Sequence, residues 1–116
     1  MKVLIVGYGS VGKRHVNNLL KYTNSEIIIC SKRNDLNLLR KKNVKIFKSL
    51  DKCLSEKPDI GFITNETVYH IPTSIKLAKV GLDLFIEKPL SDSMKNILTL
   101  NKIVKQKKLV IQMGYN

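Results

Sequence analysis

The sequence predicts an α/β protein built on a doubly wound sheet of about six parallel strands. Short, nearly continuous apolar runs recur along the chain, and segments with helical periodicity separate them. A glycine-rich turn follows the first apolar run. Connections long enough to hold a helix join parallel strands and are right-handed. We therefore expect one domain over residues 1–116 with the strand order 3-2-1-4-5-6.

The expected strands are apolar runs bounded by turn residues. Val3–Val6 is continuously apolar and ends at Gly7, which is typical of a strand buried on both faces of a sheet. Ile27–Cys30 follows Asn24 and Ser25 and has the same character. Four further strands are expected at Val44–Phe47, Ile60–Thr64, Leu82–Ile86 and Leu109–Met113.

Helices are expected between these strands because apolar residues recur there at helical spacing and capping residues mark the ends. In Val11–Tyr22 the apolar side chains gather on one side, as a helix packed on a sheet requires. Pro72 suits the first turn of a helix and Gly81 suits a helix end. Further helices are expected from Asp35, as N-cap, to about Lys42, and at Ser49–Glu56, Tyr69–Val80 and Ser91–Lys107.

The chain is strongly basic, with 21 Lys and Arg against 9 Asp and Glu and a formal net charge of +12. The lysines are spread along the chain and 6% of residues are aromatic, which favours solvated helix faces over a nucleic-acid surface. The N-terminus lacks the apolar core of a signal peptide, and no apolar run approaches the roughly 20 residues of a membrane span. Cys30 and Cys53 form no CxxC pair, so we expect reduced thiols in a cytoplasmic protein, without a metal site or disulfide framework.

A glycine-rich turn with the spacing GxGxxG lies between the first strand and the first helix, where the Rossmann dinucleotide-binding fingerprint requires it. Gly7 allows a sharp turn, Gly9 lets the backbone approach a pyrophosphate, and Gly12 allows close packing of helix on strand. Backbone N–H groups at the helix start then bind phosphate. The sequence predicts that NADP or NAD contacts Gly7, Tyr8, Gly9, Ser10, Val11 and Gly12.

The end of the second strand favours NADP over NAD. In this fold an acidic residue about 20 positions after the glycine turn binds the ribose hydroxyls of NAD. Here the segment is Ser31, Lys32 and Arg33, whose hydroxyl and two cations suit a 2′-phosphate. Arg33 is also expected to lie over the adenine. Asp35 is an acidic residue close to this position in the sequence, so NAD stays the alternative cofactor.

Four segments resemble, in order, the N-terminal NAD(P)-binding domain of the glucose–fructose oxidoreductase / inositol dehydrogenase / MocA (Gfo/Idh/MocA) family. The Glu-Lys-Pro sequence at residues 87–89 is the most specific of them. The resemblance covers the whole chain but only the first half of a family enzyme. The segments are the glycine turn continued through His15, then Thr64 and Asn65 leading to His70, then Gly81–Leu90, and finally Gly114–Asn116.

The resemblance implies an oxidoreductase that transfers hydride to or from a sugar, nucleotide sugar or polyol. Lys88 corresponds to the family's catalytic lysine, which binds the substrate hydroxyl and tunes the proton relay, and we also expect Lys88 to contact the cofactor. Glu87 would contact the ribose or nicotinamide region of the cofactor, and His15 would pack or hydrogen-bond beside the glycine turn. At the fourth strand end the expected cofactor contacts are Thr64, Asn65 and His70, the last with helix capping as its alternative role. Asn65 and Glu66 stand where the family usually has threonine and proline.

The resemblance assigns the remaining catalytic groups, an aspartate and a histidine, to a second α/β domain that also forms the substrate pocket. We expect that domain to begin after residue 116, so the chain is either a piece of a longer protein or the product of a truncated gene. Its absence would leave an apolar edge and favour a homo-oligomer. The alternative function is a stand-alone nucleotide-binding or redox-sensing module without catalysis. Net charge alone supports a third class, a nucleic-acid-binding domain.

Overall fold

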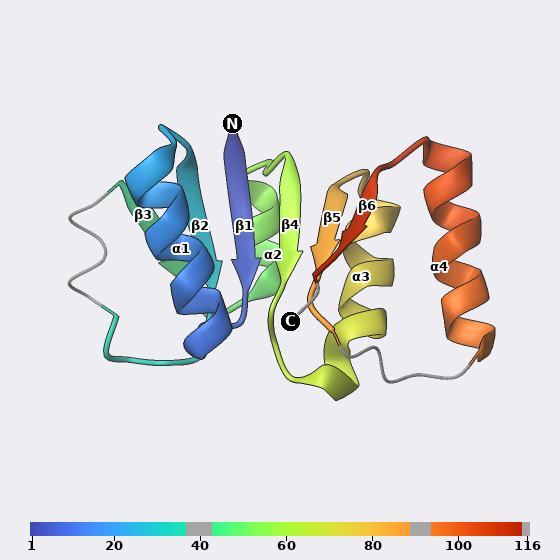
Figure 1. Ribbon diagram of the computed structural model, residues 1–116, viewed down its shortest axis with the longest axis horizontal. Coiled ribbons are helices and arrows are strands. Elements are labelled where there is room, and N and C mark those ends of the chain that lie inside the picture. The colour runs from blue at the N-terminus through green and yellow to red at the C-terminus, as the bar shows by residue number, and fades with distance from the viewer. Residues whose placement is uncertain (37–42, 89–93, 115–116) are drawn as a thin grey trace.

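The computed structural model describes residues 1–36, 43–88 and 94–114. Within them the chain forms one sheet of six parallel strands in the order β3-β2-β1-β4-β5-β6, which confirms the predicted topology (Figure 1). The strands are β1 (Lys2–Val6), β2 (Glu26–Cys30), β3 (Val44–Phe47), β4 (Ile60–Ile63), β5 (Asp83–Ile86) and β6 (Ile111–Met113).

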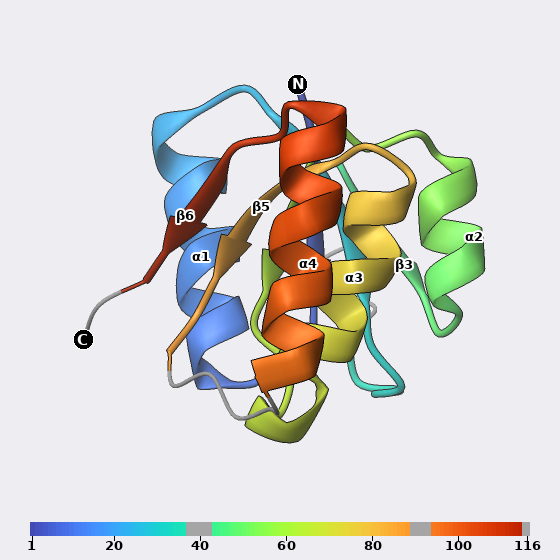
Figure 2. The ribbon, with the colours of Figure 1, turned by 90° about the vertical axis from the view of Figure 1, so that its right-hand side faces the viewer.

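Helices cover both faces of the sheet (Figure 2). Helix α1 (Ser10–Tyr22) lies on one face, whereas α2 (Leu50–Ser55), α3 (His70–Lys79) and α4 (Met94–Lys107) lie on the other. A short 3₁₀ turn, η2 (Thr67–Tyr69), leads into α3. The helix expected after Asp35, and the first residues of the one expected from Ser91, fall at 37–42 and 89–93, which lie outside the described residues.

Each face of the sheet has its own hydrophobic core, and this explains why β1 is continuously apolar. Val3 and Ile5 pack with Val16 of α1 on one face. Leu4 and Val6 belong to the core beneath α2, α3 and α4. Because successive side chains of a strand point to opposite faces, a strand covered on both sides contains apolar residues at every position.

Two strands begin later than predicted because the residues before them close the preceding helix. The Leu82 N–H donates to the Leu77 carbonyl at 3.2 Å, and Gly81 adopts a φ of +89° at this turn. Likewise, the Leu109 N–H donates to the Val104 carbonyl at 3.0 Å. A left-handed residue at a helix end bends the chain so that these backward hydrogen bonds form. Leu82 and Leu109 therefore belong to helix-closing turns, and the predicted strand starts at these positions are wrong.

Candidate functional site

The residues that follow the strands form one row along a single edge of the sheet. Five of them donate the backbone N–H to the last residue of a neighbouring strand, which extends the sheet by one bond and fixes the first residue of the loop. In open parallel sheets ligands bind outside this edge, where the strand order reverses. The bonds run from Gly7 to Cys30 (2.9 Å), Ser31 to Phe47 (3.0 Å), Thr64 to Val6 (3.0 Å), Glu87 to Ile63 (3.1 Å) and Gly114 to Ile86 (2.8 Å).

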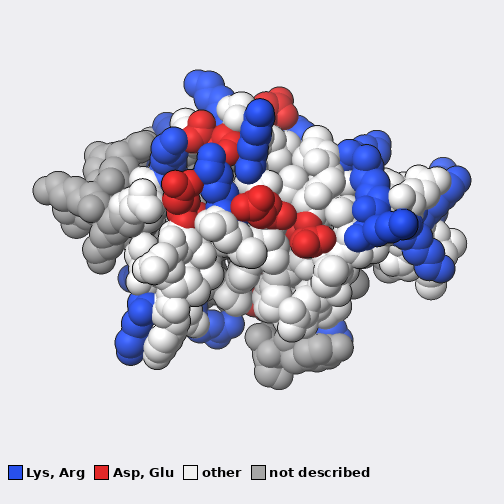
Figure 3. Space-filling view, turned by 90° about the horizontal axis from the view of Figure 1, so that it is seen from above, with Lys and Arg blue, Asp and Glu red and all other residues white. Residues whose placement is uncertain are grey.

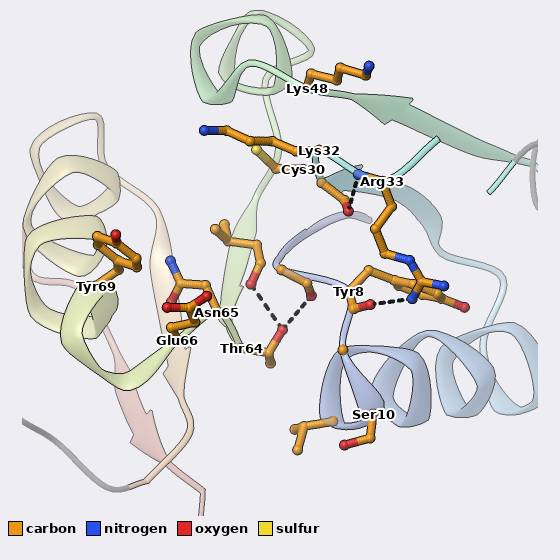
Figure 4. A pocket seen from close by; sticks show the side chains of 15 residues that line it. Tyr8, Ser10, Cys30, Lys32, Arg33, Lys48, Thr64, Asn65, Glu66 and Tyr69 are labelled. Atoms are coloured by element: carbon orange, nitrogen blue, oxygen red, sulfur yellow. Dashed lines mark hydrogen bonds between the residues drawn. The ribbon is translucent and has the colours of Figure 1, made fainter. Parts of the chain in front are cut away.

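A groove of about 880 Å³ lies over this edge, around the ends of β1, β2 and β4 (Figure 4). It therefore lies at the point where the strand order reverses, between β1 and β4. Its lining brings together most of the predicted cofactor-binding residues. The lining residues are Val6, Gly7, Tyr8, Gly9, Ser10, Val11, Cys30, Ser31, Lys32, Arg33, Lys48, Thr64, Asn65, Glu66 and Tyr69.

The three glycines of the turn have different surroundings. Gly7 has a φ of +92°, and a Cβ there would lie 2.6 Å from the Asn65 Cα. A Cβ at Gly12 would lie 2.3 Å from the Gly7 carbonyl oxygen, so α1 packs on this turn without room for a methyl group. At Gly9, by contrast, a Cβ would meet no atom within 4 Å. Gly9 thus adds no packing to the fold, and a side chain there would enter the groove.

The close contact at Gly12 predicts a loss of stability on substitution. We expect Gly12→Ala to lower the free energy of unfolding by about 1–3 kcal/mol, because overpacking against backbone outweighs the better helix propensity of alanine. Denaturant unfolding measures this change. Gly9→Ala is the matched control and should stay within about 0.5 kcal/mol of the unmodified chain. Equal stability of the two variants would contradict the packing described for Gly12.

The N-terminus of α1 points its backbone donors at the groove. Gly9 is the N-cap, no side chain caps the helix, and its first turn contains no acidic residue. Thr64 fixes the turn from the other side, because its hydroxyl donates to the carbonyl oxygens of Val6 (3.0 Å) and Gly7 (2.8 Å) (Figure 4). The N–H groups of an uncapped helix start can bind a phosphate group when no side chain blocks its approach and the preceding turn is held in place.

One end of the groove is built around Arg33, which contacts both the glycine turn and Asp35. Its Nη1 donates to the Tyr8 carbonyl at 2.9 Å, and the guanidinium lies 5.7 Å from the centroid of the Tyr8 ring (Figure 4). Its Nε and Nη2 donate to the Asp35 carboxylate at 2.9 and 2.6 Å. The hydrogen bond to Asp35 raises the pKa of Arg33, and the same bond lowers the pKa of Asp35. Asp35 thus forms an ion pair with Arg33, and the helix that we expected it to cap falls at residues 37–42, outside the described residues.

Lys48 lines the same end of the groove, and the sequence reasoning did not single it out. It follows β3 directly and also lines a second, smaller cavity of about 110 Å³ together with Ser31 and Arg33. The row of residues after the strands would have indicated it, because a parallel sheet brings every strand end to the same edge. Three cations, Lys32, Arg33 and Lys48, thus line the same groove as Ser31.

The other end of the groove is formed by the loop after β4. His70 is 3% exposed, and its Nε2 lies 2.8 Å from the Asn65 carbonyl oxygen. The Asn65 side-chain Nδ2 donates to Thr73 Oγ1 at 3.1 Å. Asn65 Oδ1 and His70 Nδ1 are buried without a protein partner. His70 therefore holds the loop that presents Asn65, and it does not itself line the groove.

Glu87 and Lys88 lie at the same sheet edge but outside the groove lining. Glu87 is buried, and its Oε1 lies 2.6 Å from His15 Nε2. The His15 ring packs edge-on against the rings of Phe62 and Phe85 at 5.1 and 5.2 Å. Lys88 follows directly and is exposed. In the structure the Glu87 carboxylate therefore faces α1, whereas from the sequence we expected it to contact the cofactor.

Acidic side chains gather at the edge of the sheet opposite the groove. Seen from the end at which the strands start, they cluster between lysines (Figure 3). Glu26 and Asp83 begin β2 and β5, and the Asp59 carboxylate accepts a 2.8 Å bond from the Lys2 backbone N–H. The groove lining, by contrast, holds three cations and one acid, Glu66. This separation of charge favours an anionic ligand in the groove.

Two further features concern the described part of the chain. It contains no group of three or more His, Cys, Asp or Glu side chains placed to hold a metal ion. None of its helices is long and apolar enough to cross a membrane.

Comparison with known proteins gives one family. The family model for the Gfo/Idh/MocA oxidoreductases, described as having an NAD-binding Rossmann fold, matches residues 1–115. No match was found among curated protein sequences.

Solved structures with the same fold include several dehydrogenases. UDP-N-acetylglucosamine 3-dehydrogenase GnnA from Acidithiobacillus ferrooxidans has a TM-score of 0.83 at 20% identity, over 98% of this chain and 38% of that one. The WlbA dehydrogenase from Chromobacterium violaceum, in complex with NADH and UDP-GlcNAcA, has a TM-score of 0.86 at 20% identity, over 98% of this chain and 34% of that one. The apo scyllo-inositol dehydrogenase from Lactobacillus casei has a TM-score of 0.87 at 24% identity, over 98% of this chain and 36% of that one. This chain thus spans little more than a third of the length of these proteins.

Proposed function

This chain belongs to the Gfo/Idh/MocA oxidoreductase family with an NAD-binding Rossmann fold, and we propose that it is the cofactor domain of an NAD(P)-dependent enzyme acting on a sugar, nucleotide sugar or polyol. The observation that carries the proposal is the open position of Gly9 at the uncapped start of α1, inside a groove of about 880 Å³. The names of similar dehydrogenases include a nucleotide sugar, UDP-N-acetylglucosamine, and a polyol, scyllo-inositol, which supports these substrate classes.

The glycine turn is the proposed pyrophosphate site. A dinucleotide needs backbone N–H donors that face two phosphates at close range, and Ser10, Val11 and Gly12 begin α1 behind the side-chain-free Gly9. The helix dipole adds to the attraction for negative charge. The residues present therefore fit the pyrophosphate of NAD or NADP.

The cluster of Ser31, Lys32, Arg33 and Lys48 is the proposed site for the adenosine end, with NADP as the preferred cofactor. Arg33 presents a guanidinium plane held by Tyr8 and Asp35, and an adenine ring can stack on such a plane. Lys32 and Lys48 supply charge for a 2′-phosphate. Asp35 offsets the charge of Arg33, so the preference rests on the two lysines and the Ser31 hydroxyl. NAD is the alternative cofactor, because the similar WlbA structure contains NADH.

We expect the chain to bind NADP(H) more tightly than NAD(H) in calorimetric titrations. Arg33→Ala should weaken NADP binding by about 1–3 kcal/mol, the range for a lost charged hydrogen-bond partner, and should weaken NAD binding less. Lys48→Ala should act in the same direction. Lys45→Ala is the matched control, since Lys45 lies within β3, outside the groove lining, and pairs with Glu56. Equal or tighter binding of NAD would contradict the NADP preference.

Lys88 is the proposed catalytic residue, by its match to the family lysine. It follows Glu87, whose backbone bond to Ile63 fixes the end of β5 at the ligand edge. A cation at a strand end binds a substrate hydroxyl and stabilises the alkoxide that develops as its proton leaves. When bound, the nicotinamide supplies the hydride chemistry. Asn65 is the proposed polar contact at the nicotinamide end, on the loop that His70 holds.

A further inference from the structure

Two cysteines that are far apart in the sequence meet at the floor of the groove. Cys30 is the last residue of β2, is partly exposed and lines the groove (Figure 4). Cys53, on α2, is 0% exposed and belongs to the core against which Cys30 packs. The Cys53 Sγ lies 3.9 Å from the carbonyl oxygen of Ile29, the neighbour of Cys30. The side chains of Cys30 and Cys53 therefore pack into the same core, close enough for each thiol to influence the ionisation of the other, and both cysteines are free.

The surroundings make Cys30 the more reactive of the two thiols. The hydrogen bond from Cys53 lowers the pKa of Cys30 against the opposing effect of burial, and the charges of Lys32 and Lys76 lower it further. The same contact and burial raise the pKa of Cys53. The thiolate is the form that attacks oxidants, so a partly exposed, low-pKa cysteine beside a second thiol has the features of a redox-active pair.

We propose that Cys30 is a peroxide-oxidation site and that Cys53 resolves it into an intramolecular disulfide. In the first step the Cys30 sulfur attacks hydrogen peroxide, the O–O bond breaks, and sulfenic acid and water form. In the second step the Cys53 sulfur attacks the sulfenic sulfur. An S–S bond forms, and the sulfenic oxygen leaves as water with the thiol proton. Peroxide is the oxidant that is reduced in this sequence.

Because Cys30 lines the groove, we expect a bound cofactor to affect its oxidation. This part of the inference rests on the proposed function. Access to Cys30 is through the groove, because Cys53 and the core lie behind it. A dinucleotide on the glycine turn and Ser31 would cover the Cys30 sulfur. Cofactor binding is therefore expected to protect the thiol, which makes the pair sensitive to oxidant only when the groove is empty.

The test treats the whole chain with hydrogen peroxide and follows the product by intact mass and peptide mapping. The expected product is a monomer that has lost two hydrogens, with a peptide linking Cys30 to Cys53. Cys53→Ser should accumulate sulfenic acid at Cys30, trapped by dimedone, and Cys53→Ala serves if the serine variant does not fold. Cys30→Ser should leave Cys53 unreactive. Oxidation of Cys53 at the original rate in Cys30→Ser, or only intermolecular disulfides in the unmodified chain, would overturn the proposal.

A second arm repeats the reaction with NADP⁺, which peroxide does not oxidise. With free cofactor at about 100 times its Kd, the rate of Cys30 oxidation should fall by about 100-fold, because only the unoccupied fraction reacts. Calorimetric binding without protection would overturn the coupling of Cys30 to the groove. Absence of any calorimetric binding would instead overturn the proposed function, and the reaction without cofactor would still decide the cysteine chemistry.

Discussion

Gly9→Val is expected to abolish nicotinamide-dinucleotide binding while the chain stays folded. The backbone at Gly9 has a φ of −89°, which valine adopts without strain, and a Cβ there meets no protein atom within 4 Å. The isopropyl group would occupy the groove in front of the N–H donors of α1. Losing two charge-assisted hydrogen bonds costs about 3–6 kcal/mol, which corresponds to a drop in affinity of about 100-fold or more.

Calorimetric titration with NADP⁺ measures this loss, and circular dichroism with denaturant unfolding checks the fold. Gly9→Ala gives a graded comparison, because a methyl group protrudes less and should weaken binding less than valine does. Gly12→Ala separates the two effects, since its main consequence is lower stability. A folded Gly9→Val variant that keeps the affinity of the unmodified chain would refute the position of the phosphate site.

The chain by itself is expected to oxidise no sugar, nucleotide sugar or polyol. Lys88 is exposed, and solvent weakens the stabilisation that a cation gives to a developing alkoxide. The chain also spans little more than a third of the length of the similar dehydrogenases, and we expect the residues that hold a substrate against Lys88 to belong to the proposed second domain. Productive positioning supplies roughly 7–11 kcal/mol of barrier reduction in favourable cases.

The measurement follows the absorbance of reduced nicotinamide with a panel of these substrates and both cofactors. No turnover above background is expected from the unmodified chain or from Lys88→Ala. A longer protein that carries the chain and a second domain should turn over one member of the panel and lose most of that activity in Lys88→Ala. Turnover by the 116-residue chain that depends on Lys88 would show that a complete catalytic set lies within it.

The strand order, the two-sided core and the glycine turn followed from the sequence because each depends on local pattern. A continuous apolar run such as Val3–Val6 is typical of a strand with helices on both faces, and the helix-bearing connections then determine the topology. The glycine turn could be assigned because its position between strand and helix supplies the context that a bare GxGxxG lacks.

The contacts made by side chains across the fold did not follow from the sequence. The pairing of Glu87 with His15 joins residues 72 positions apart, and nothing local distinguishes a carboxylate that faces α1 from one that faces a ligand. The contact between Cys30 and Cys53 likewise depends on how α2 packs on β2. The ion pair between Arg33 and Asp35 is local, but it competes with helix capping, and both roles suit an aspartate at that position.

The most direct test of cofactor binding in the groove is an NMR titration of the chain with NADP⁺, followed through backbone amide shifts. The proposed site predicts saturable changes that are largest at the glycine turn Gly7–Gly12 and at Ser31–Arg33, with smaller changes at Asn65. The amides of Glu26 and Asp83, at the opposite edge of the sheet, should not move. Shifts confined to that opposite edge, or no saturable shifts at all, would contradict binding of the dinucleotide in the groove.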